Sequence, residues 1–257
     1  MRLKMLEAGA GEPVALLHGL FGQGRNFGLV QRNLSERHRM LAIDLRNHGE
    51  SPHDARMDYP AMAGDVTETL RAAEARPAAV LGHSMGGKVA MMLALTDPGA
   101  VSRLVVADIA PRGYRPTFGA YAAAMRAIPL RPGLTRKEAD AALVEAVPEA
   151  GVRAFLLQNL DFAAEPPRWR IGLEEIAAAM DDIVGWPALS AGARYDGPVL
   201  ILRGESSGYI RPEDEPGLRA LFPQARFATV AKAGHWLHAE NPAGFLEAIT
   251  PFLEDRA

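Results

Sequence analysis

Residues 78–95, AAVLGHSMGGKVAMMLAL, place one serine between two different apolar patterns. The pattern before the serine is a short continuous apolar run, which is typical of a buried parallel strand. The pattern that starts at Lys88 is longer and indicates a helix. Gly82 and Gly86 flank Ser84, and glycine permits the sharp, strained turn that leads a strand directly into a helix. The stretch therefore predicts a strand–turn–helix unit with the Ser84 hydroxyl exposed at the helix N-terminus.

Five further apolar runs of strand length surround this unit. They occupy residues 13–17, 39–44, 103–109, 198–202 and 225–230. Helical patterns separate most of them, and this alternation favours a mostly parallel sheet with helices on both faces. Together with the G-x-S-x-G turn, it predicts the α/β class and, within it, the α/β-hydrolase fold.

A long interval separates the strand that ends near Ile109 from the strand that starts near Pro198. It has no convincing strand pattern, and prolines divide it into four helical stretches. We expect these helices at residues 118–128, 136–147, 151–160 and 169–184. The chain is thus predicted to be one domain, residues 1–257, with a helical cap inserted over about residues 112–190.

Composition excludes several classes of function. The 257 residues are 48% apolar and 23% charged, which suits a globular domain with a sizeable core. A net charge of −3 gives no indication of a nucleic-acid partner. The absence of cysteine excludes disulfides and thiolate catalysis. With neither a signal-peptide pattern nor a membrane-spanning apolar segment, we expect a cytoplasmic protein that does not cross a membrane.

Two backbone amides are predicted to bind an oxyanion beside Ser84. The N–H of Met85 directly follows the nucleophile, and the fold takes its second donor from the loop after an earlier strand. That loop is HGLFG, in which Leu20 is the preferred donor and Phe21 the alternative. We expect His18 to orient this loop through hydrogen bonds rather than to transfer protons.

His235 is the predicted base. It follows the final strand, in the loop AGHW, where a triad histidine of this fold is expected. His238 competes for the role, but we expect it to point elsewhere from the start of the next segment. Three other histidines fit less well, since two lie in polar, surface-like stretches and one should face away from the turn: His38, His53 and His83.

The third member of the triad is not where the fold usually places it. The carboxylate normally follows the penultimate strand, and Ser207 occupies that position here. Asp108 ends the strand after the nucleophile helix, at the same sheet edge as Ser84 and His235, and a buried acid there needs a partner. The alternatives are that Asp108 caps a following helix, or that Glu205 is the acid.

The chain resembles the YbfF-like esterases, a group of small α/β hydrolases related to the mammalian abhydrolase-domain-eleven proteins. The resemblance covers nearly the whole chain and is carried by HGLFGQGRNF (18–27), DLRNHGESPH (44–53), GHSMGGKVAM (82–91), VVADIAP (105–111), FLLQNL (155–160) and AGHWLHAE (233–240). It implies Asp108 as the acid, with Ser207 beside His235 as an auxiliary group. It also implies esterase or thioesterase activity on small esters or acyl-CoA thioesters.

These features predict a serine hydrolase that forms an acyl-Ser84 intermediate and requires neither a metal nor an organic cofactor. Its partner is a small ester or thioester, and the protein is expected to be a monomer or a homodimer. Carbon–carbon hydrolysis and perhydrolysis use the same triad and remain alternatives. A ligand receptor without catalytic activity is a further alternative of a different class.

Side chains in the predicted cap could either serve the structure or bind the substrate. Packing is favoured over an acyl-pocket role for the aromatic and methionine residues Tyr114, Phe118, Tyr121, Met125 and Trp186. We expect Arg112 and Arg115 to be exposed to solvent rather than to bind an anion. Arg46 and Ser51, in the RNHGESP segment, are expected to be structural.

Overall fold

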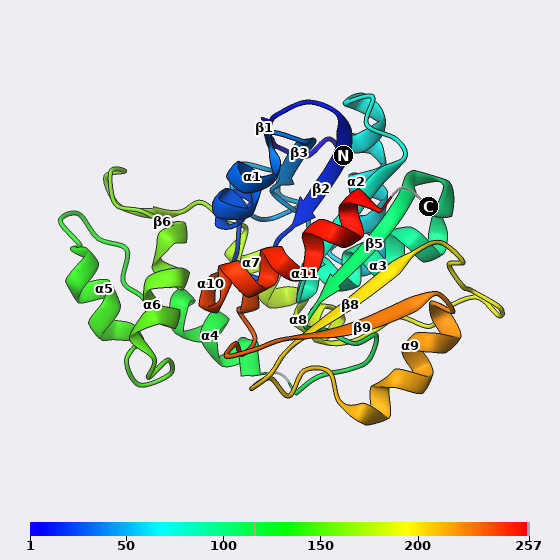
Figure 1. The fold of residues 1–257 in the computed structure, drawn as a ribbon. Coiled ribbons are helices and arrows are strands. Elements are labelled where there is room, and N and C mark those ends of the chain that lie inside the picture. Colours follow the sequence, from blue (N-terminus) through cyan, green and yellow to red (C-terminus); the bar gives the residue numbers. More distant parts are fainter. Residues whose placement is uncertain (116, 256–257) are drawn as a thin grey trace.

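The computed structural model describes residues 1–115 and 117–255. A seven-stranded sheet in the order β1-β3-β2-β4-β5-β8-β9 forms its centre (Figure 1). The strands are β1 (Met5–Ala8), β2 (Glu12–Leu17), β3 (His38–Ile43), β4 (Ala78–His83), β5 (Val101–Ala107), β8 (Val199–Gly204) and β9 (Ala225–Val230). All neighbours are parallel except β1, which pairs antiparallel with β3. The sequence predicted six of these strands and missed β1, an edge strand with two exposed residues.

Helices cover both faces of the sheet (Figure 1). One face carries α1 (Gly28–Leu34) and α11 (Pro242–Glu254), and the other carries α2 (Tyr59–Ala72), α3 (Met85–Thr96) and α9 (Glu215–Leu221). Shorter helices complete the fold: α10 (Leu237–Glu240), η1 (Gly24–Phe27), η2 (Pro98–Ala100), η3 (Leu157–Asn159) and η4 (Pro212–Asp214). None of the helices in the described part of the chain is long and apolar enough to cross a bilayer.

The regular elements between β5 and β8 are mainly helices, as predicted, and this segment lies beyond one end of the sheet (Figure 1). It contains α4 (Thr117–Arg126), α5 (Arg136–Leu143), α6 (Ala150–Leu156), α7 (Leu173–Ala178) and α8 (Met180–Val184). We call it the insertion. The expectation of no strand was wrong, because β6 (Leu160–Asp161) pairs with β7 (Arg168–Trp169). A pair of two-residue strands is too short for a periodic pattern to reveal.

The last helix predicted in the insertion also differs from the structure. Its first residue, 169, belongs to β7, so α7 begins only at Leu173. The backbone then leaves the helical region at Ala179, with φ −91° and ψ 11°, and α8 follows. The continuous apolar pattern therefore concealed two short helices rather than one long helix.

The carboxyl ends of the parallel strands gather the chemically relevant loops at one edge of the sheet. Strand β2 leads into His18, β4 into Ser84 and β5 into Asp108. Strand β8 leads into the loop of Ser207, and β9 into the loop of His235. Ligand sites of open α/β sheets form at this edge.

Candidate active site

Backbone strain and close packing fix the Ser84 side chain at the end of β4, where its exposed fraction is only 8%, although the sequence predicted an exposed hydroxyl. Ser84 has φ 53° and ψ −120°, a conformation that costs about 1–3 kcal/mol and persists only because the surrounding structure imposes it. A Cβ atom on Gly82 would lie 2.1 Å from the Gly86 carbonyl oxygen, and one on Gly86 would lie 2.2 Å from the Leu17 carbonyl oxygen. Only glycine fits these two positions, so the sequence around Ser84 follows directly from the shape of the turn.

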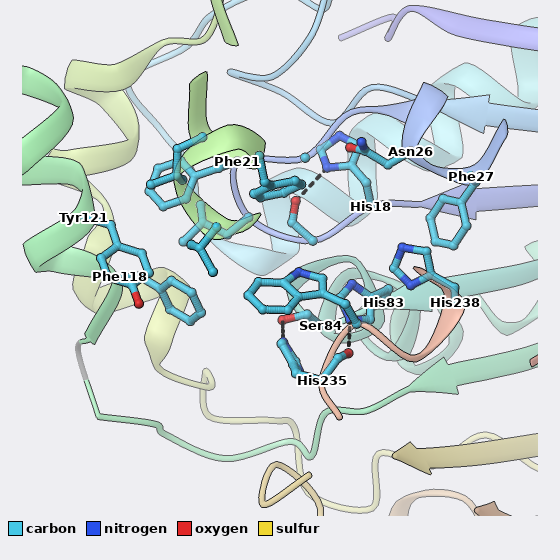
Figure 2. Close-up of a pocket in the computed structure, with 17 residues that line it drawn as sticks. His18, Phe21, Asn26, Phe27, His83, Ser84, Phe118, Tyr121, His235 and His238 are labelled. Carbon is cyan, nitrogen blue, oxygen red and sulfur yellow. Dashed lines mark hydrogen bonds between the residues drawn. The ribbon is translucent and has the colours of Figure 1, made fainter. Parts of the chain in front are cut away.

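A continuous chain of hydrogen bonds joins Ser84, His235 and Asp108. Figure 2 shows its link between Ser84 and His235. The distance from Ser84 Oγ to His235 Nε2 is 3.0 Å, and from His235 Nδ1 to Asp108 Oδ2 it is 2.8 Å. Asp108 is completely buried, and its carboxylate accepts the N–H of Gly204 at 3.1 Å. Since a carboxylate can only accept, Nδ1 carries the proton, which leaves Nε2 free to accept the Ser84 proton.

The observed contacts argue against both alternatives, Asp108 as a helix cap and Glu205 as the acid. The next helix, α4, begins only at Thr117, so Asp108 does not cap it. Glu205 is exposed and accepts the backbone N–H of Lys232 at 2.8 Å, and it forms no hydrogen bond with His235. Of the two acids, only Asp108 lies against the imidazole.

Ser207 contacts Asp108 rather than the imidazole. Its hydroxyl donates to Asp108 Oδ2, the same oxygen that accepts from His235. Ser207 Oγ in turn accepts the N–H of Tyr209 at 3.2 Å. A hydrogen bond shared directly between Ser207 and the histidine is not what the structure shows, because the carboxylate lies between them.

Two further groups hold His235, and sequence analysis identified neither. The ring of Tyr209 stacks on the imidazole with 3.6 Å between centroids and 13° between planes. His83 Nε2 donates to the backbone carbonyl of His235 at 2.7 Å, so His83 is turned away from Ser84 Oγ but not away from the site. Both contacts join residues distant in the chain, which no local pattern encodes.

The remaining histidines have separate environments. His238 lies in α10, where its ring is 4.7 Å from that of His83 and 4.9 Å from that of Phe27, and it makes no hydrogen bond to Ser84 or Asp108. His53 is exposed, as predicted. His38 was predicted at the surface but is buried at the amino end of β3, away from the edge that carries Ser84.

Two neutral histidines fix the loop that follows β2. His18 Nδ1 donates to the Gly19 carbonyl at 2.8 Å, and its Nε2 accepts the N–H of Leu45 at 2.9 Å, which is the orienting role predicted. His48 Nε2 accepts the N–H of Phe21 at 3.0 Å. The Phe21 N–H therefore already has an acceptor. Within residues 1–115 and 117–255, the Leu20 N–H donates to no protein group.

The Met85 N–H is free to bind an oxyanion because it lies at the N-terminus of a helix. Met85 is the first residue of α3, and the first four N–H groups of a helix have no intrahelical acceptor. The helix dipole adds a partial positive charge at this end. The geometry thus leaves the amides of Leu20 and Met85 free beside the Ser84 hydroxyl.

Burial of these histidines predicts acid-sensitive stability. Burial lowers the pKa of His18 and His238 to about 4 and that of His48 to about 3. Because the unfolded chain binds these protons near pH 6.5, their contribution to stability is complete above pH 6.5 and is lost as the pH falls toward 4. Each histidine should lower the free energy of unfolding by about 1.4 kcal/mol per pH unit in this range. Urea unfolding between pH 7.5 and 4.5 measures the slope, and a flat profile would contradict the neutral assignments.

Replacing His48 by leucine should weaken the fold and the oxyanion loop together. The substitution leaves the Phe21 N–H and the Arg46 carbonyl without their buried partner, which should lower the free energy of unfolding by about 1–3 kcal/mol. A displaced Leu20 amide should lower kcat by about tenfold or more. Urea unfolding and ester hydrolysis measure both effects. The exposed His53→Leu is the matched control, and equal behaviour of the two variants would refute the assignment.

Two cavities of about 30 Å³ each flank Ser84, and both are also lined by Leu20 and Phe118. The histidine-side cavity, shown in Figure 2, is further lined by His18, Phe21, Tyr121, Phe155, His235 and Trp236. The lysine-side cavity is further lined by Tyr59, Lys88, Ile109, Tyr114, Ile183 and Tyr209.

Three of the five insertion side chains considered from the sequence therefore reach a cavity: Tyr114, Phe118 and Tyr121. Met125 and Trp186 do not line either one. Met125 is fully buried in the core, and Trp186 packs 5.8 Å from the ring of Tyr59. Met125 and Trp186 therefore pack, as the sequence favoured, whereas the other three residues both pack against the core and line a cavity.

The arginines and Ser51 make mostly structural contacts. Arg112 pairs with Asp214 at 2.8 Å, and Arg115 is exposed. Buried Arg46 pairs with Asp65 at 2.6 Å, and the Ser51 hydroxyl donates to the Asp44 carbonyl at 2.6 Å. Among the residues described, no three His, Asp or Glu side chains are grouped as metal ligands would be.

Comparison with known proteins places the chain in a family. Residues 12–242 match the sequence profile of the family described as alpha/beta hydrolase fold. The mouse protein named sn-1-specific diacylglycerol lipase ABHD11 is 42% identical, over 93% of this chain and 80% of its own length. Esterase YbfF of Escherichia coli is 38% identical, over 95% of this chain and 93% of its own length.

A solved structure shows the same architecture. The structure described as a marine microorganism esterase is 35% identical and superposes with a TM-score of 0.93, over 98% of this chain and 99% of that chain. The fold class predicted from the sequence is thereby confirmed. The relatives are esterases and lipases by name, which agrees with the ester hydrolase activity predicted for this chain. The chain belongs to the alpha/beta hydrolase fold family, in the group of YbfF-like ester hydrolases.

Proposed function

We propose that this ester hydrolase acts through Ser84 as nucleophile, His235 as base and Asp108 as the acid that orients the base. The observation that carries the proposal is the unbroken hydrogen-bond chain from Ser84 Oγ through His235 to buried Asp108, beside two free backbone amides. Ester hydrolysis by this arrangement needs a nucleophile, a proton acceptor and donors for the developing oxyanion. The proposal assigns each of these roles to a described group.

In the first step, Ser84 Oγ attacks the carbonyl carbon of the substrate while its proton moves to His235 Nε2. The carbonyl oxygen becomes negatively charged and accepts hydrogen bonds from the amides of Leu20 and Met85. The Asp108 carboxylate stabilises the imidazolium that forms. Collapse of the tetrahedral intermediate breaks the bond to the leaving group, which takes the proton from Nε2 and leaves an acyl ester on Ser84.

In the second step, water replaces the leaving group. His235 removes a proton from the water as it attacks the acyl carbon, and the same two amides hold the second oxyanion. The proton then returns to Ser84 Oγ, and the carboxylic acid is released. Ser207 supports both steps indirectly, because its hydrogen bond helps to keep the Asp108 carboxylate in place.

We further propose that the insertion acts as a cap and that thioesters are cleaved as well as esters. Phe118 and Tyr121 of α4 enter the lining of the histidine-side cavity, which supports a role for the insertion in substrate binding. A thioester presents the same carbonyl geometry with a better leaving group, so the triad needs no further residue for it. The cytoplasmic location and the monomeric or homodimeric state stay predictions.

A substrate panel tests this activity. We expect hydrolysis of p-nitrophenyl esters and of acyl-CoA thioesters, measured by release of p-nitrophenol and of free thiol. Hydrolysis of neither class by the folded protein would contradict the proposal and favour the receptor alternative. Cleavage of carbon–carbon bonds or peroxide-dependent acyl transfer, in the absence of ester hydrolysis, would favour those chemistries instead.

A further inference from the structure

The end of insertion helix α8 is held by two side chains of the core. Lys88 Nζ, on α3, donates to the carbonyls of Val184 at 3.1 Å and Gly185 at 2.5 Å. The hydroxyl of Tyr59, at the start of α2, donates to the carbonyl of Ile183 at 2.5 Å. Three successive carbonyls at the C-terminal end of α8 thus accept hydrogen bonds from side chains of α2 and α3. We call this set of contacts the α8 clamp.

Lys88 is an unusual residue for a contact of this kind, because it is buried. Its exposed fraction is 1%, and its ammonium lies 5.3 Å from the ring centroid of Tyr59 and 4.9 Å from that of Tyr114. Burial lowers the pKa of Lys88 to about 7, with a further contribution from Arg112. A buried cation needs compensating partners, and the carbonyl end of a helix supplies them. The contact with α8 is therefore strongly favoured over an unattached ammonium.

The clamp adjoins the nucleophile. Lys88 lies on α3, four residues after Ser84, which immediately precedes that helix. Helical side chains lean toward the helix N-terminus, which is the end next to Ser84. Ser84 and Lys88 consequently line the same cavity, the lysine-side cavity. Ile183 and Val184 of α8 line it as well. The position of α8 therefore sets one wall of the space beside the nucleophile.

The position of His235 indicates which half of a substrate uses this space. The leaving-group atom must lie near His235 Nε2 to receive its proton, and His235 lines the histidine-side cavity. The carbonyl oxygen points to the Leu20 and Met85 amides. The acyl substituent is then directed to the other side of Ser84, into the lysine-side cavity, whose volume of about 30 Å³ has room for roughly two water molecules.

We propose that Lys88 is a positioning residue that, together with Tyr59, fixes α8 against the nucleophile helix and thereby restricts the acyl cavity to short chains. The inference rests on the proposed function, since it assumes attack by Ser84 on an acyl group. It assigns acyl-length selectivity to a residue that takes no part in proton transfer. Release of the clamp lets the wall formed by Ile183 and Val184 move outward, and longer acyl chains then enter.

The test compares two series of esters in the wild type and in Lys88→Met. In the acyl series, p-nitrophenyl acetate, butyrate and octanoate, we expect the octanoate-to-acetate ratio of kcat/KM to rise by about tenfold or more. In the alcohol series, ethyl, butyl and octyl acetate, the ratio of kcat/KM for octyl acetate to that for ethyl acetate should change less than twofold. The exposed Lys137→Met is the matched control and should leave both ratios unchanged. An unchanged acyl ratio, or equal changes in both series, would overturn the proposal.

A second variant and a second measurement separate movement of α8 from a mere change in cavity polarity. Tyr59→Phe removes one contact of the clamp without changing the charge beside Ser84, and it should shift the acyl ratio in the same direction. Hydrogen exchange at residues 180–185 should be faster in both variants than in the wild type. Normal exchange in both would refute the clamp. An absence of all ester hydrolysis in the wild type would refute the proposed function and the acyl selectivity that rests on it, while the exchange experiment would still decide whether Lys88 and Tyr59 hold α8.

Discussion

The Ser84→Ala variant is expected to lose about 10⁶-fold in kcat, close to complete inactivation. The hydroxyl oxygen forms the bond to the acyl group, and no other nucleophile in the described residues forms a hydrogen bond with His235 Nε2. Alanine has no atom that can form this bond, so only the amides of Leu20 and Met85 would still assist a direct attack by water. Steady-state hydrolysis of p-nitrophenyl acetate measures the loss.

The control for this experiment is Ser190→Ala, at an exposed serine of the insertion. It should retain wild-type kcat, and circular dichroism should show that both variants are folded. Alanine occupies the same strained backbone conformation as serine, so we expect the stability of Ser84→Ala to stay close to that of the wild type. A residual rate within tenfold of the wild type would show that the nucleophile is another residue.

The Asp108→Asn variant should lower kcat by about 10³–10⁴-fold. The amide nitrogen donates where the carboxylate accepted, so the imidazole would present the wrong tautomer to Ser84. The amide would also disturb the hydrogen bonds from Gly204 and Ser207, which both donate to this side chain. The expected loss is therefore larger than that of any substitution outside the triad. Initial rates near neutral pH measure it.

Glu205→Gln is the matched comparison, because Glu205 was the alternative acid. Its carboxylate is exposed and bonded to the backbone of Lys232, so neutralising it should leave kcat within about twofold of the wild type. Loss of activity in Glu205→Gln together with a nearly normal Asp108→Asn would reverse the assignment. A large loss in both would indicate that the loops after β5 and β8 together, rather than one acid, position His235.

Local rules account for the parts of the site that the sequence could predict. The Ser84 turn follows from two glycines, since any Cβ there would collide with a backbone oxygen. The parallel strands follow from continuous apolar runs, and the carboxyl ends of those strands lie at one edge by geometry. Because position 207 holds a serine and not a carboxylate, the sequence predicted another acid, Asp108, which does contact His235.

Long-range contacts account for the parts that the sequence could not predict. His48 accepts the Phe21 N–H across 27 residues, and Tyr209 stacks on His235 from a different loop. The Lys88 contact with α8 spans almost 100 residues. Each depends on the fold bringing two segments together, and no residue spacing along a single element records it. The same reason explains why Ser207 was placed beside the histidine instead of beside Asp108.

Covalent labelling tests the central assignment most directly. The wild-type protein should react with a fluorophosphonate at a 1:1 ratio, and peptide mass spectrometry should locate the single adduct on Ser84. The Ser84→Ala variant should remain unlabelled, and Asp108→Asn should react more slowly than the wild type. An active wild-type protein that carries no adduct, or carries it on a residue other than Ser84, would contradict the account.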